Sequence, residues 1–346
     1  MAICTIVVLF SSCEKDKDGS PDVKAGDMSS GALNPGEAGG GELLTLEGAG
    51  IGDIRSIVFE KNNVPASFQP TLNTETHLIF HVPDTAYGGP QNVIFTNSAG
   101  KTLSVPFSVL AFASVSQASN YNFTEGVEIT LTGNNLDDVS KVVFTGTTEA
   151  ITIVSKERKK MVIKMPATQI ARATLDITNS TGLTTTTQEF INLDKALKIF
   201  TDSYGPDYGD NSWGDGAVIS STEFKSGTKS ISKTYAKGNW HVFGFANWWP
   251  GTANDNYKYF SFWIKGAAAD HILYITGDKK AGGGFGNSDQ SSPVNVPAGV
   301  WTYYKIPLSS LNLWANGTPF NQIGFWIKGP DNQDEKFYLD DVILVK

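Results

Sequence analysis

Tryptophan is confined to one part of this chain. The first 200 residues contain none, and the remainder contains eight: Trp213, Trp240, Trp248, Trp249, Trp263, Trp301, Trp314 and Trp326. An indole ring offers a large flat apolar face and a single N–H donor. The C–H face of a pyranose ring packs on such a surface, while the sugar hydroxyls seek polar partners at its edge. The distribution therefore predicts that the last third of the chain, from about residue 195, recognises carbohydrate.

The best candidates for a sugar-binding surface lie in segments that the sequence pattern leaves unburied. Trp240 opens a strand that leads to the adjacent pair Trp248 and Trp249, and a Pro-Gly turn follows. Neighbouring side chains of a strand point to opposite faces, so at least one of this pair should be exposed or lie on a loop. The predicted carbohydrate-binding residues are Trp240, Trp248, Trp249, Tyr274, Asn287 and Trp314.

The segment 277–292 is glycine-rich and polar, and we expect it to be mobile. Glycine lets the backbone approach a ligand closely. Asp278, Asn287 and Asp289 in this segment are expected to offer hydrogen bonds to sugar hydroxyls. A phosphate-binding loop is excluded, because no strand–loop–helix pattern and no Gly-Lys-Ser/Thr motif follow.

Two other tryptophans, Trp263 and Trp326, occupy the same motif, Phe-Trp-Ile-Lys-Gly. Period-two alternation puts both on the less apolar faces of their strands. We expect each to be covered by a loop or by the neighbouring domain, or else to belong to a binding face. Trp301 follows a Gly-Val turn and opens another strand, and we expect it in the core.

Alternating segments with turn residues between them position these side chains. About eight strands in 150 residues are typical of a jelly-roll β-sandwich, with one short helical turn expected at 307–311. The predicted strands cover residues 198–200, 230–236, 240–245, 257–265, 271–276, 301–306, 322–328 and 336–345.

A unit of about 80 residues occurs twice before the aromatic region. Residues 43–48 match 128–133, residues 57–59 match 142–144, and residues 96–98 match 178–180. Each copy consists of short alternating runs separated by Gly, Asn, Asp and Pro. That pattern predicts a small antiparallel β-sandwich for each copy.

The first 13 residues predict a secretion signal. An apolar run at 1–10 is too short to span a bilayer. The residues Phe10-Ser11-Ser12-Cys13 resemble a bacterial lipoprotein cleavage site, which implies that Cys13 carries a lipid. The charged stretch that follows resembles a surface-export signal and is expected to be a solvated tether.

Composition and cysteine content exclude several classes of function. The formal net charge is −8, so a nucleic-acid-binding surface is not expected and an uncharged glycan is favoured. Both cysteines lie within the first 13 residues, which excludes a disulfide or a cysteine nucleophile in the folded body. Glycoside hydrolysis needs two facing carboxylates, and no paired acidic motif occurs on one strand. The basic run 156–160 is interpreted as a solvated hairpin loop.

The ordered motifs resemble known modules. Both repeats resemble the IPT/TIG immunoglobulin-like module, in which a Thr-Leu-x-Gly strand is followed by a Val-Val-Phe or Ile-Val-Phe strand. The strings at 259–266, 301–311 and 337–345 resemble jelly-roll carbohydrate-binding modules of bacterial glycanases. The expected fold is therefore all-β, with two immunoglobulin-like β-sandwiches followed by a jelly-roll β-sandwich. The expected segments are a signal peptide (1–12), a tether (13–33), two IPT/TIG-like domains (34–111 and 112–193) and a carbohydrate-binding domain (194–346).

As a whole, the chain resembles a surface glycan-binding lipoprotein of a Bacteroidetes polysaccharide-utilisation locus. The resemblance implies a non-catalytic protein, lipid-anchored in the outer membrane and facing the cell exterior. It also implies a partner transporter complex and a captured polysaccharide, for which we expect a neutral β-glucan or other hemicellulose. No cofactor is required, but related modules hold a structural calcium, for which Asp202 and Asp340 or Asp341 are the candidates here. The alternatives are a surface adhesin that recognises protein and a glycan-active enzyme.

Overall fold

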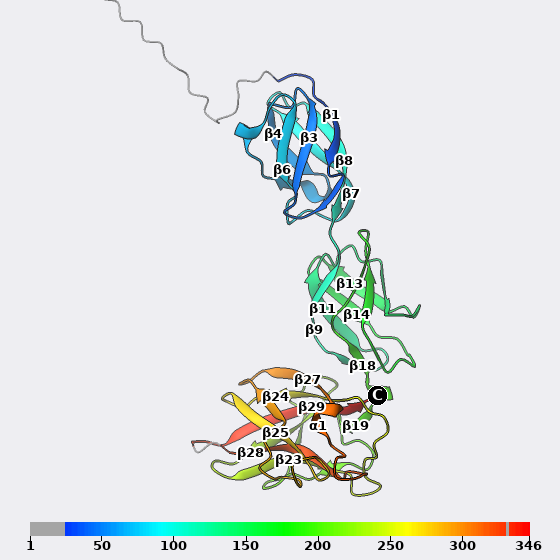
Figure 1. Ribbon diagram of the computed structural model, residues 1–346, viewed down its shortest axis with the longest axis vertical. Helices are drawn as coiled ribbons and strands as arrows, with labels where there is room; N and C mark the ends of the chain where they lie inside the picture. Colours follow the sequence, from blue (N-terminus) through cyan, green and yellow to red (C-terminus); the bar gives the residue numbers. More distant parts are fainter. Residues whose placement is uncertain (1–24, 330–331) are drawn as a thin grey trace, which may run out of the picture.

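Three β-domains follow one another along residues 25–329 and 332–346, the part of the chain that the computed structural model describes (Figure 1). Each domain has a separate hydrophobic core. Strands dominate these residues, and the all-β fold class is confirmed. No helix in this part of the chain is long and apolar enough to cross a bilayer. The predicted signal peptide (1–12) and Cys13 lie outside the described residues.

The first domain packs a three-stranded sheet, β1-β3-β6, against a five-stranded sheet, β2-β8-β7-β4-β5. Residues 29–33 of its strand β1 belong to the segment 13–33 that was expected to be a tether, so that expectation is wrong for this part. Ser29 pairs with Ala49 of β3, and Ser30 pairs with Gly48. The elements are β1 (Ser29–Asn34), β2 (Glu37–Gly39), β3 (Leu43–Ala49), β4 (Ile54–Phe59), η1 (Lys61–Asn63), β5 (Val64–Ala66), η2 (Pro70–Leu72), β6 (His77–His81), β7 (Gly89–Asn97) and β8 (Thr102–Leu110).

The second domain builds three small sheets around its own core: β13-β14-β11-β9, β12-β16-β17 and β10-β18-β15. Its elements are β9 (Ser114–Ala118), β10 (Asn122–Phe123), β11 (Glu128–Asn134), β12 (Lys141–Phe144), β13 (Thr152–Glu157), β14 (Lys160–Lys164), β15 (Arg172–Ala173), β16 (Leu175–Thr178), β17 (Leu183–Thr185), β18 (Phe190–Asn192) and η3 (Leu193–Lys195).

A hydrogen-bonded loop contact recurs in the first two domains and supports the internal repeat. In the first domain, Asp53 accepts from both the backbone N–H and the hydroxyl of Ser98, at 3.2 and 2.5 Å. In the second domain, Asp138 accepts the same two bonds from Ser180. The two Asp residues lie 85 positions apart, the offset of 128–133 from 43–48, and the two Ser residues lie 82 positions apart, the offset of 178–180 from 96–98. The repeats therefore share local geometry as well as sequence.

The basic run 156–160 does more than form a solvated hairpin, contrary to our expectation. Arg158 donates to the backbone oxygens of Thr85 (2.7 Å) and Ala86 (3.0 Å) in the first domain. Its guanidinium also lies 4.3 Å from the ring centroid of Tyr87. This hairpin therefore helps to join the first two domains.

The third domain is a sandwich of two mainly antiparallel sheets. We call β21-β22-β29-β24-β27, with β19 beside β29, the junction sheet, and β20-β23-β28-β25-β26 the distal sheet. The elements are β19 (Leu197–Phe200), β20 (Gly209–Asp210), β21 (Val218–Ser220), β22 (Ser230–Tyr235), β23 (Trp240–Ala246), β24 (Tyr259–Lys265), β25 (His271–Gly277), β26 (Pro293–Val296), β27 (Trp301–Pro307), α1 (Leu308–Leu311), β28 (Gln322–Lys328) and β29 (Glu335–Val345).

The core of the third domain lies between these two sheets. Phe260, Phe262 and Ile264 of β24 are fully buried there, as their alternation predicted. Phe325 of β28 meets them from the distal sheet, with its ring centroid 4.8 Å from that of Phe262. The outer face of each sheet is thus left to the residues of opposite parity, which include Trp263 and Trp326.

The second domain packs on the junction sheet, close to the C-terminus (Figure 1). A small apolar cluster joins Ile191 and Leu193 to Ile343 and Val345 of β29. The C-terminal residue takes part as well, since its backbone oxygen accepts a 2.9 Å hydrogen bond from Nε of Arg172.

Candidate functional site

Exposure divides the eight tryptophans into two groups. Trp213, Trp240, Trp248 and Trp249 are 40, 38, 65 and 85% exposed. All four lie on or beside β23: Trp240 opens it, the adjacent pair follows it, and the N–H of Trp213 bonds to the backbone oxygen of Val242 at 2.9 Å. We call these four residues the aromatic edge. Flat apolar surface that stays exposed beside a strand is suited to stacking against sugar rings.

A hydrogen-bonded turn holds Trp248 and Trp249 in place. The side-chain oxygen of Asn247 accepts from the N–H of Gly251 at 3.0 Å. The amide of Asn321 donates to the backbone oxygens of Asn247 (2.9 Å) and Trp248 (3.4 Å). Because the backbone of this turn is fixed at both ends, the two exposed indoles are presented with little conformational freedom to lose on binding.

Trp314 supports this turn and is itself only partly exposed. Its ring packs against Phe320 with centroids 5.2 Å apart, and its indole N–H donates to the backbone oxygen of Thr252 at 2.8 Å. The polar residues around Trp314 in the sequence suggested an open loop, but the loop folds back onto the core. The structure therefore places this predicted binding residue beneath the turn.

At the far end of β23, Trp240 belongs to a stack of three rings. It lies parallel to Trp326, at a centroid distance of 4.7 Å and an interplanar angle of 7°. Tyr274 of β25 stacks on the same Trp326 at 4.9 Å. The predicted residues Trp240 and Tyr274 are thus brought together through a third aromatic residue, which is itself only 3% exposed.

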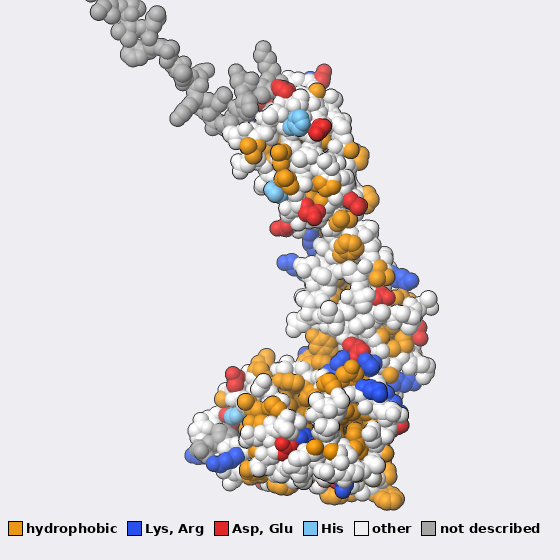
Figure 2. All heavy atoms as spheres, viewed as in Figure 1, with side chains coloured by type: hydrophobic (Ala, Val, Ile, Leu, Met, Phe, Trp, Pro, Cys, Tyr) orange, Lys and Arg blue, Asp and Glu red, His pale blue; other side chains and the backbone are white. Residues whose placement is uncertain are grey.

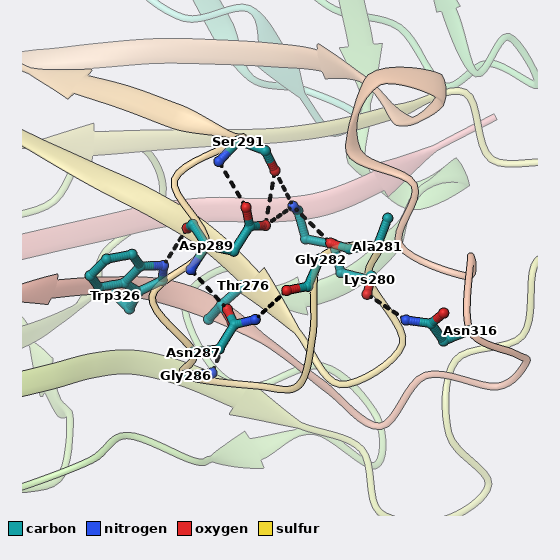
Figure 3. Close-up of polar contacts among 10 residues, drawn as sticks. All are labelled: Thr276, Lys280, Ala281, Gly282, Gly286, Asn287, Asp289, Ser291, Asn316 and Trp326. Carbon is teal, nitrogen blue, oxygen red and sulfur yellow. Dashed lines mark hydrogen bonds and ion pairs between the residues drawn. The ribbon is translucent and has the colours of Figure 1, made fainter.

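The glycine-rich segment covers this stack. Its backbone oxygens accept the indole N–H of Trp240, at Gly286 (3.1 Å), and that of Trp326, at Asp289 (2.8 Å). Asn287 braces the segment internally, donating to Gly282 at 2.7 Å and accepting from the N–H of Asp289 at 3.1 Å (Figure 3). The predicted binding residue Asn287 therefore has both ends of its amide engaged within the segment.

A buried ion pair closes the same segment. Lys280 is 3% exposed, and its ammonium lies 2.5 Å from a carboxylate oxygen of Asp289 and 2.8 Å from the hydroxyl of Ser291 (Figure 3). Burial alone would raise the pKa of Asp289, but the hydrogen bonds from Lys280 and Ser291 and the charge of Lys280 outweigh burial and lower that pKa. These contacts restrain a segment that its glycine content suggested would be mobile.

Close approach explains one glycine of this segment. Gly286 has a φ of +73°, and a β-carbon there would lie 2.2 Å from the ring of Trp213. A side chain at this position would push the segment away from the aromatic edge. Trp213 also contacts Phe285 edge-on, with ring centroids 5.9 Å apart. The segment thus packs against the aromatic edge as well as over the ring stack.

The predicted binding residues fall into two groups at opposite ends of β23. Trp240, Tyr274 and Asn287 lie under or within the glycine-rich segment, whereas Trp248 and Trp249 lie beyond the other end of the strand. Trp240 and Trp248 are eight positions apart, and β23 alone, from Trp240 to Ala246, spans about 20 Å at the usual rise per residue. A site that uses both groups would therefore run along the strand and suit a polymer more than a single sugar.

The acidic side chains near β20 and β28 accept hydrogen bonds from backbone N–H groups. Asp210 accepts from the N–H of Ser212 (3.1 Å) and of Ala217 (3.0 Å). Asp278, expected to meet sugar hydroxyls, accepts instead from Asn321 and Gln322, both at 3.0 Å. Carboxylates engaged in this way act as turn braces.

The candidate calcium ligands lie at the junction with the second domain. Asp340 accepts backbone N–H bonds from Lys225 (2.8 Å) and Ser226 (3.0 Å), and Asp202 accepts them from Thr228 and Lys229. Burial and the neighbouring Asp341 raise the pKa of Asp340 to about 8. Calcium requires six to eight oxygen ligands. The N–H donors around these carboxylates do not fit such a site, and no group of three or more His, Cys, Asp or Glu side chains in the described part of the chain could hold a metal ion.

Comparison with known proteins bears on the fold. No family model and no curated protein match the chain. Among solved structures, the chain is similar to the surface glycan-binding protein PbSGBP-B from Prevotella bryantii, with 18% identity, a TM-score of 0.54, and coverage of 90% of this chain and 94% of that one. It is also similar to SGBP-B from a complex xyloglucan utilization locus in Bacteroides uniformis, with 18% identity and a TM-score of 0.44, covering 94% of this chain and 100% of that one. The first likeness shows a shared fold over most of the length of both chains.

Sequence reasoning missed Lys280 and Gly286, which shape the site. Trp213 lies in a polar segment of Gly, Asp and Asn, as an exposed candidate should, but was not included among the predicted binding residues; the structure places it on the aromatic edge. Lys280 and Gly286 were not predicted because they lie in a glycine-rich segment whose composition resembles that of a flexible linker. The one available signal was the pair of opposite charges, Lys280 and Asp289, within that segment.

Proposed function

We propose that this protein captures a polysaccharide at the cell surface without cleaving it. The observation that carries the proposal is the aromatic edge, above all Trp248 and Trp249, which are 65 and 85% exposed on a turn fixed by hydrogen bonds. Large exposed indoles on a rigid support are costly in water unless a ligand covers them. The fold shared with a surface glycan-binding protein supports the proposal.

Capture without cleavage is consistent with the roles of the nearby carboxylates. A glycosidase needs one carboxyl group as acid and a second as base or nucleophile, facing the same bond. Asp210 and Asp278 flank the distal sheet, and both accept backbone N–H bonds. We infer that these groups keep the turns in place while the aromatic edge binds the glycan.

The glycan we propose is neutral, a β-glucan or other hemicellulose. The chain carries a net charge of −8, which opposes an acidic polymer. Affinity electrophoresis in gels containing a mixed-linkage β-glucan, a xyloglucan, a xylan or an acidic pectin tests this directly. Retardation by at least one neutral polymer is expected. Retardation by none of them would contradict the proposal and favour an adhesin, and release of reducing sugar would contradict the non-catalytic role.

We further propose that a lipid on Cys13 anchors the protein to the outer membrane, facing outward beside a glycan transporter complex. This proposal is supported by residues 10–13 and by the charged stretch that follows them in the sequence. Both lie outside the described residues. Protease treatment of intact cells should remove the third domain, and Cys13→Ala should release the protein from the membrane fraction. Full protection from protease would contradict the outward orientation.

A further inference from the structure

A second aromatic cleft lies between the second and third domains. It has a volume of about 540 Å³, within the roughly 300–1,000 Å³ typical of small-ligand sites. Tyr121 and Gln188 line it from the second domain, and Lys225, Trp301 and Tyr303 line it from the third. Hydrophobic side chains reach the surface where these two domains meet (Figure 2). The cleft adjoins the junction sheet, whereas the aromatic edge belongs to the distal sheet.

The two walls of this cleft are joined firmly. The indole N–H of Trp263 donates to the side chain of Asn120 across the domain boundary at 3.0 Å. Lys305 of β27 forms a 2.5 Å ion pair with Glu189 of the second domain. Because these contacts hold the walls at a set separation, the cleft exists before any ligand binds, and a ligand has little ordering cost to offset.

Aromatic surface remains available inside the cleft. Tyr121 stacks on Trp263 at 5.7 Å with an interplanar angle of 9°, and it meets Tyr303 at 4.9 Å. Trp301 is oriented by a 3.0 Å hydrogen bond from its indole N–H to Glu223. Tyr121, Trp301 and Tyr303 are each only partly buried. They leave faces and edges against which a ring with an apolar C–H surface can pack.

The cleft also holds a polar donor and a polar acceptor that have no hydrogen-bond partner among the described residues. The ammonium of Lys225 lies 4.3 Å from the centroid of Trp263, and no carboxylate in the described part of the chain is within ion-pair distance of it. The amide nitrogen of Gln188 donates to Ser116 at 3.0 Å, but its buried oxygen Oε1 has no hydrogen-bond partner among the described residues. Buried polar atoms of this kind are rare and call for a partner.

We propose that this cleft is a second carbohydrate subsite, which takes one pyranose unit of the captured glycan. Its C–H face packs on Trp301 and Tyr303, and one of its oxygens accepts from Lys225. In the neutral glycan proposed above, that oxygen is a hydroxyl. The proposal rests on the proposed function, and it adds a second point of contact that raises the avidity for a long chain.

Fluorine NMR of protein labelled with 5-fluorotryptophan tests the cleft and the aromatic edge separately. The Trp301 resonance is assigned with Trp301→Phe, and the edge resonances with Trp248→Ala and Trp249→Ala. The probes are cellohexaose and a xylan oligosaccharide that bears glucuronic acid. We expect a saturable shift of the Trp301 resonance, which persists in the W248A/W249A variant. A shift with cellohexaose is expected, because Lys225 meets a hydroxyl. A shift with the acidic probe alone would mean that Lys225 meets a carboxylate and would contradict a neutral glycan in the cleft.

Two variants make this test specific for the cleft. Lys225→Met keeps the side-chain stem and should weaken the Trp301 response about tenfold, the usual effect of losing a hydrogen bond to a charged group. Lys229→Met is the matched control, because Lys229 is an exposed lysine four positions further along the same loop and does not line the cleft. If Trp301 responds to neither probe while the edge resonances shift, the subsite proposal fails and the proposed function stands. If Trp301 alone responds, the edge proposal fails instead.

Discussion

The two outer faces of the third domain carry the same sequence motif, but different parts of the molecule cover them. Trp263 on the junction sheet and Trp326 on the distal sheet both lie in Phe-Trp-Ile-Lys-Gly, and they are 4 and 3% exposed. Each donates its indole N–H to the element that covers it, Trp263 to the side chain of Asn120 and Trp326 to the backbone oxygen of Asp289. Each also has an aromatic partner parallel to its ring.

The covers differ in origin and extent. The hydrogen-bond acceptor of Trp263, Asn120, lies 143 positions away in another domain. The acceptor of Trp326, Asp289, lies 37 positions away in the same domain. A whole domain sits on the junction sheet, but only one segment sits on the distal sheet and leaves the β23 side exposed. The comparison teaches that the strand motif alone does not decide whether a tryptophan is buried. The element that packs over the sheet decides whether the tryptophan is buried. The surface that this element leaves exposed becomes the candidate site.

Removing either buried indole should give the largest loss of stability. Trp263→Ala and Trp326→Ala each delete a large buried side chain, and each should lower the free energy of unfolding by about 3–5 kcal/mol. Only Trp263→Ala also removes a contact between domains. Calorimetry should therefore show one shifted transition for Trp326→Ala, and a separation of the transitions of the second and third domains for Trp263→Ala. The same separation in both variants would contradict the comparison.

Breaking the ion pair between Lys280 and Asp289 should cause the next largest loss of stability. Lys280→Met leaves the carboxylate of Asp289, whose side chain is 14% exposed, without its counter-ion and should cost about 2 kcal/mol. The segment should then lift from Trp240 and Trp326, which hydrogen–deuterium exchange at 280–291 would record as faster exchange. The double variant Lys280→Met/Asp289→Asn removes the unpaired charge and should recover part of the loss. Unchanged exchange in the single variant would show that the ion pair does not hold the cover.

A smaller effect is expected beneath the turn that carries Trp248 and Trp249. Trp314→Phe keeps the packing against Phe320 but loses the hydrogen bond to Thr252, which should cost about 1 kcal/mol. Because Trp314 supports the turn without facing the glycan, affinity should fall much less than in the W248A/W249A variant. Equal losses of affinity in calorimetric titrations would place Trp314 in the binding surface itself.

Acid should produce the smallest effect on the glycine-rich segment. The pKa of Asp289 is held below its ordinary value of 3.8, so its ion pair stabilises the fold above that value, and the contribution is lost as pH falls through the lower pKa of the folded state. Hydrogen–deuterium exchange at 280–291 should therefore become faster in the wild type as the pH falls through the folded-state pKa of Asp289. This acceleration should be absent in Asp289→Asn. An identical acid response in the two proteins would exclude this carboxylate as the cause.

Periodicity predicted much of this molecule because it reports on local structure. The alternation in β24 placed Phe260, Phe262 and Ile264 in the core, and the short helix at Leu308–Leu311 matches the expected turn. The adjacent pair Trp248 and Trp249 was a sound candidate, because a strand cannot bury two neighbouring side chains on one face.

The remainder depends on contacts between distant segments, which periodicity does not report. Trp314 was expected to be exposed, but its loop folds back to bond with Thr252, 62 positions away. Trp301 was expected in the core, but β27 lies at the edge of its sheet and leaves this side chain partly buried in a cleft. Arg158 was expected to be solvated, yet it bonds to the domain before it. In each case the position of a second segment decided the outcome.

The most direct test of the central claim is calorimetric titration of the polysaccharide that retards the protein most in affinity gels. The W248A/W249A variant should bind it roughly 100-fold more weakly or not at all, because each exposed indole is expected to be a binding hot spot. Leu72→Ala is the matched control, since Leu72 is 61% exposed on the first domain, far from the aromatic edge. It should bind like the wild type. Wild-type affinity in the double tryptophan variant, with its fold intact, would contradict the claim that the aromatic edge captures the glycan.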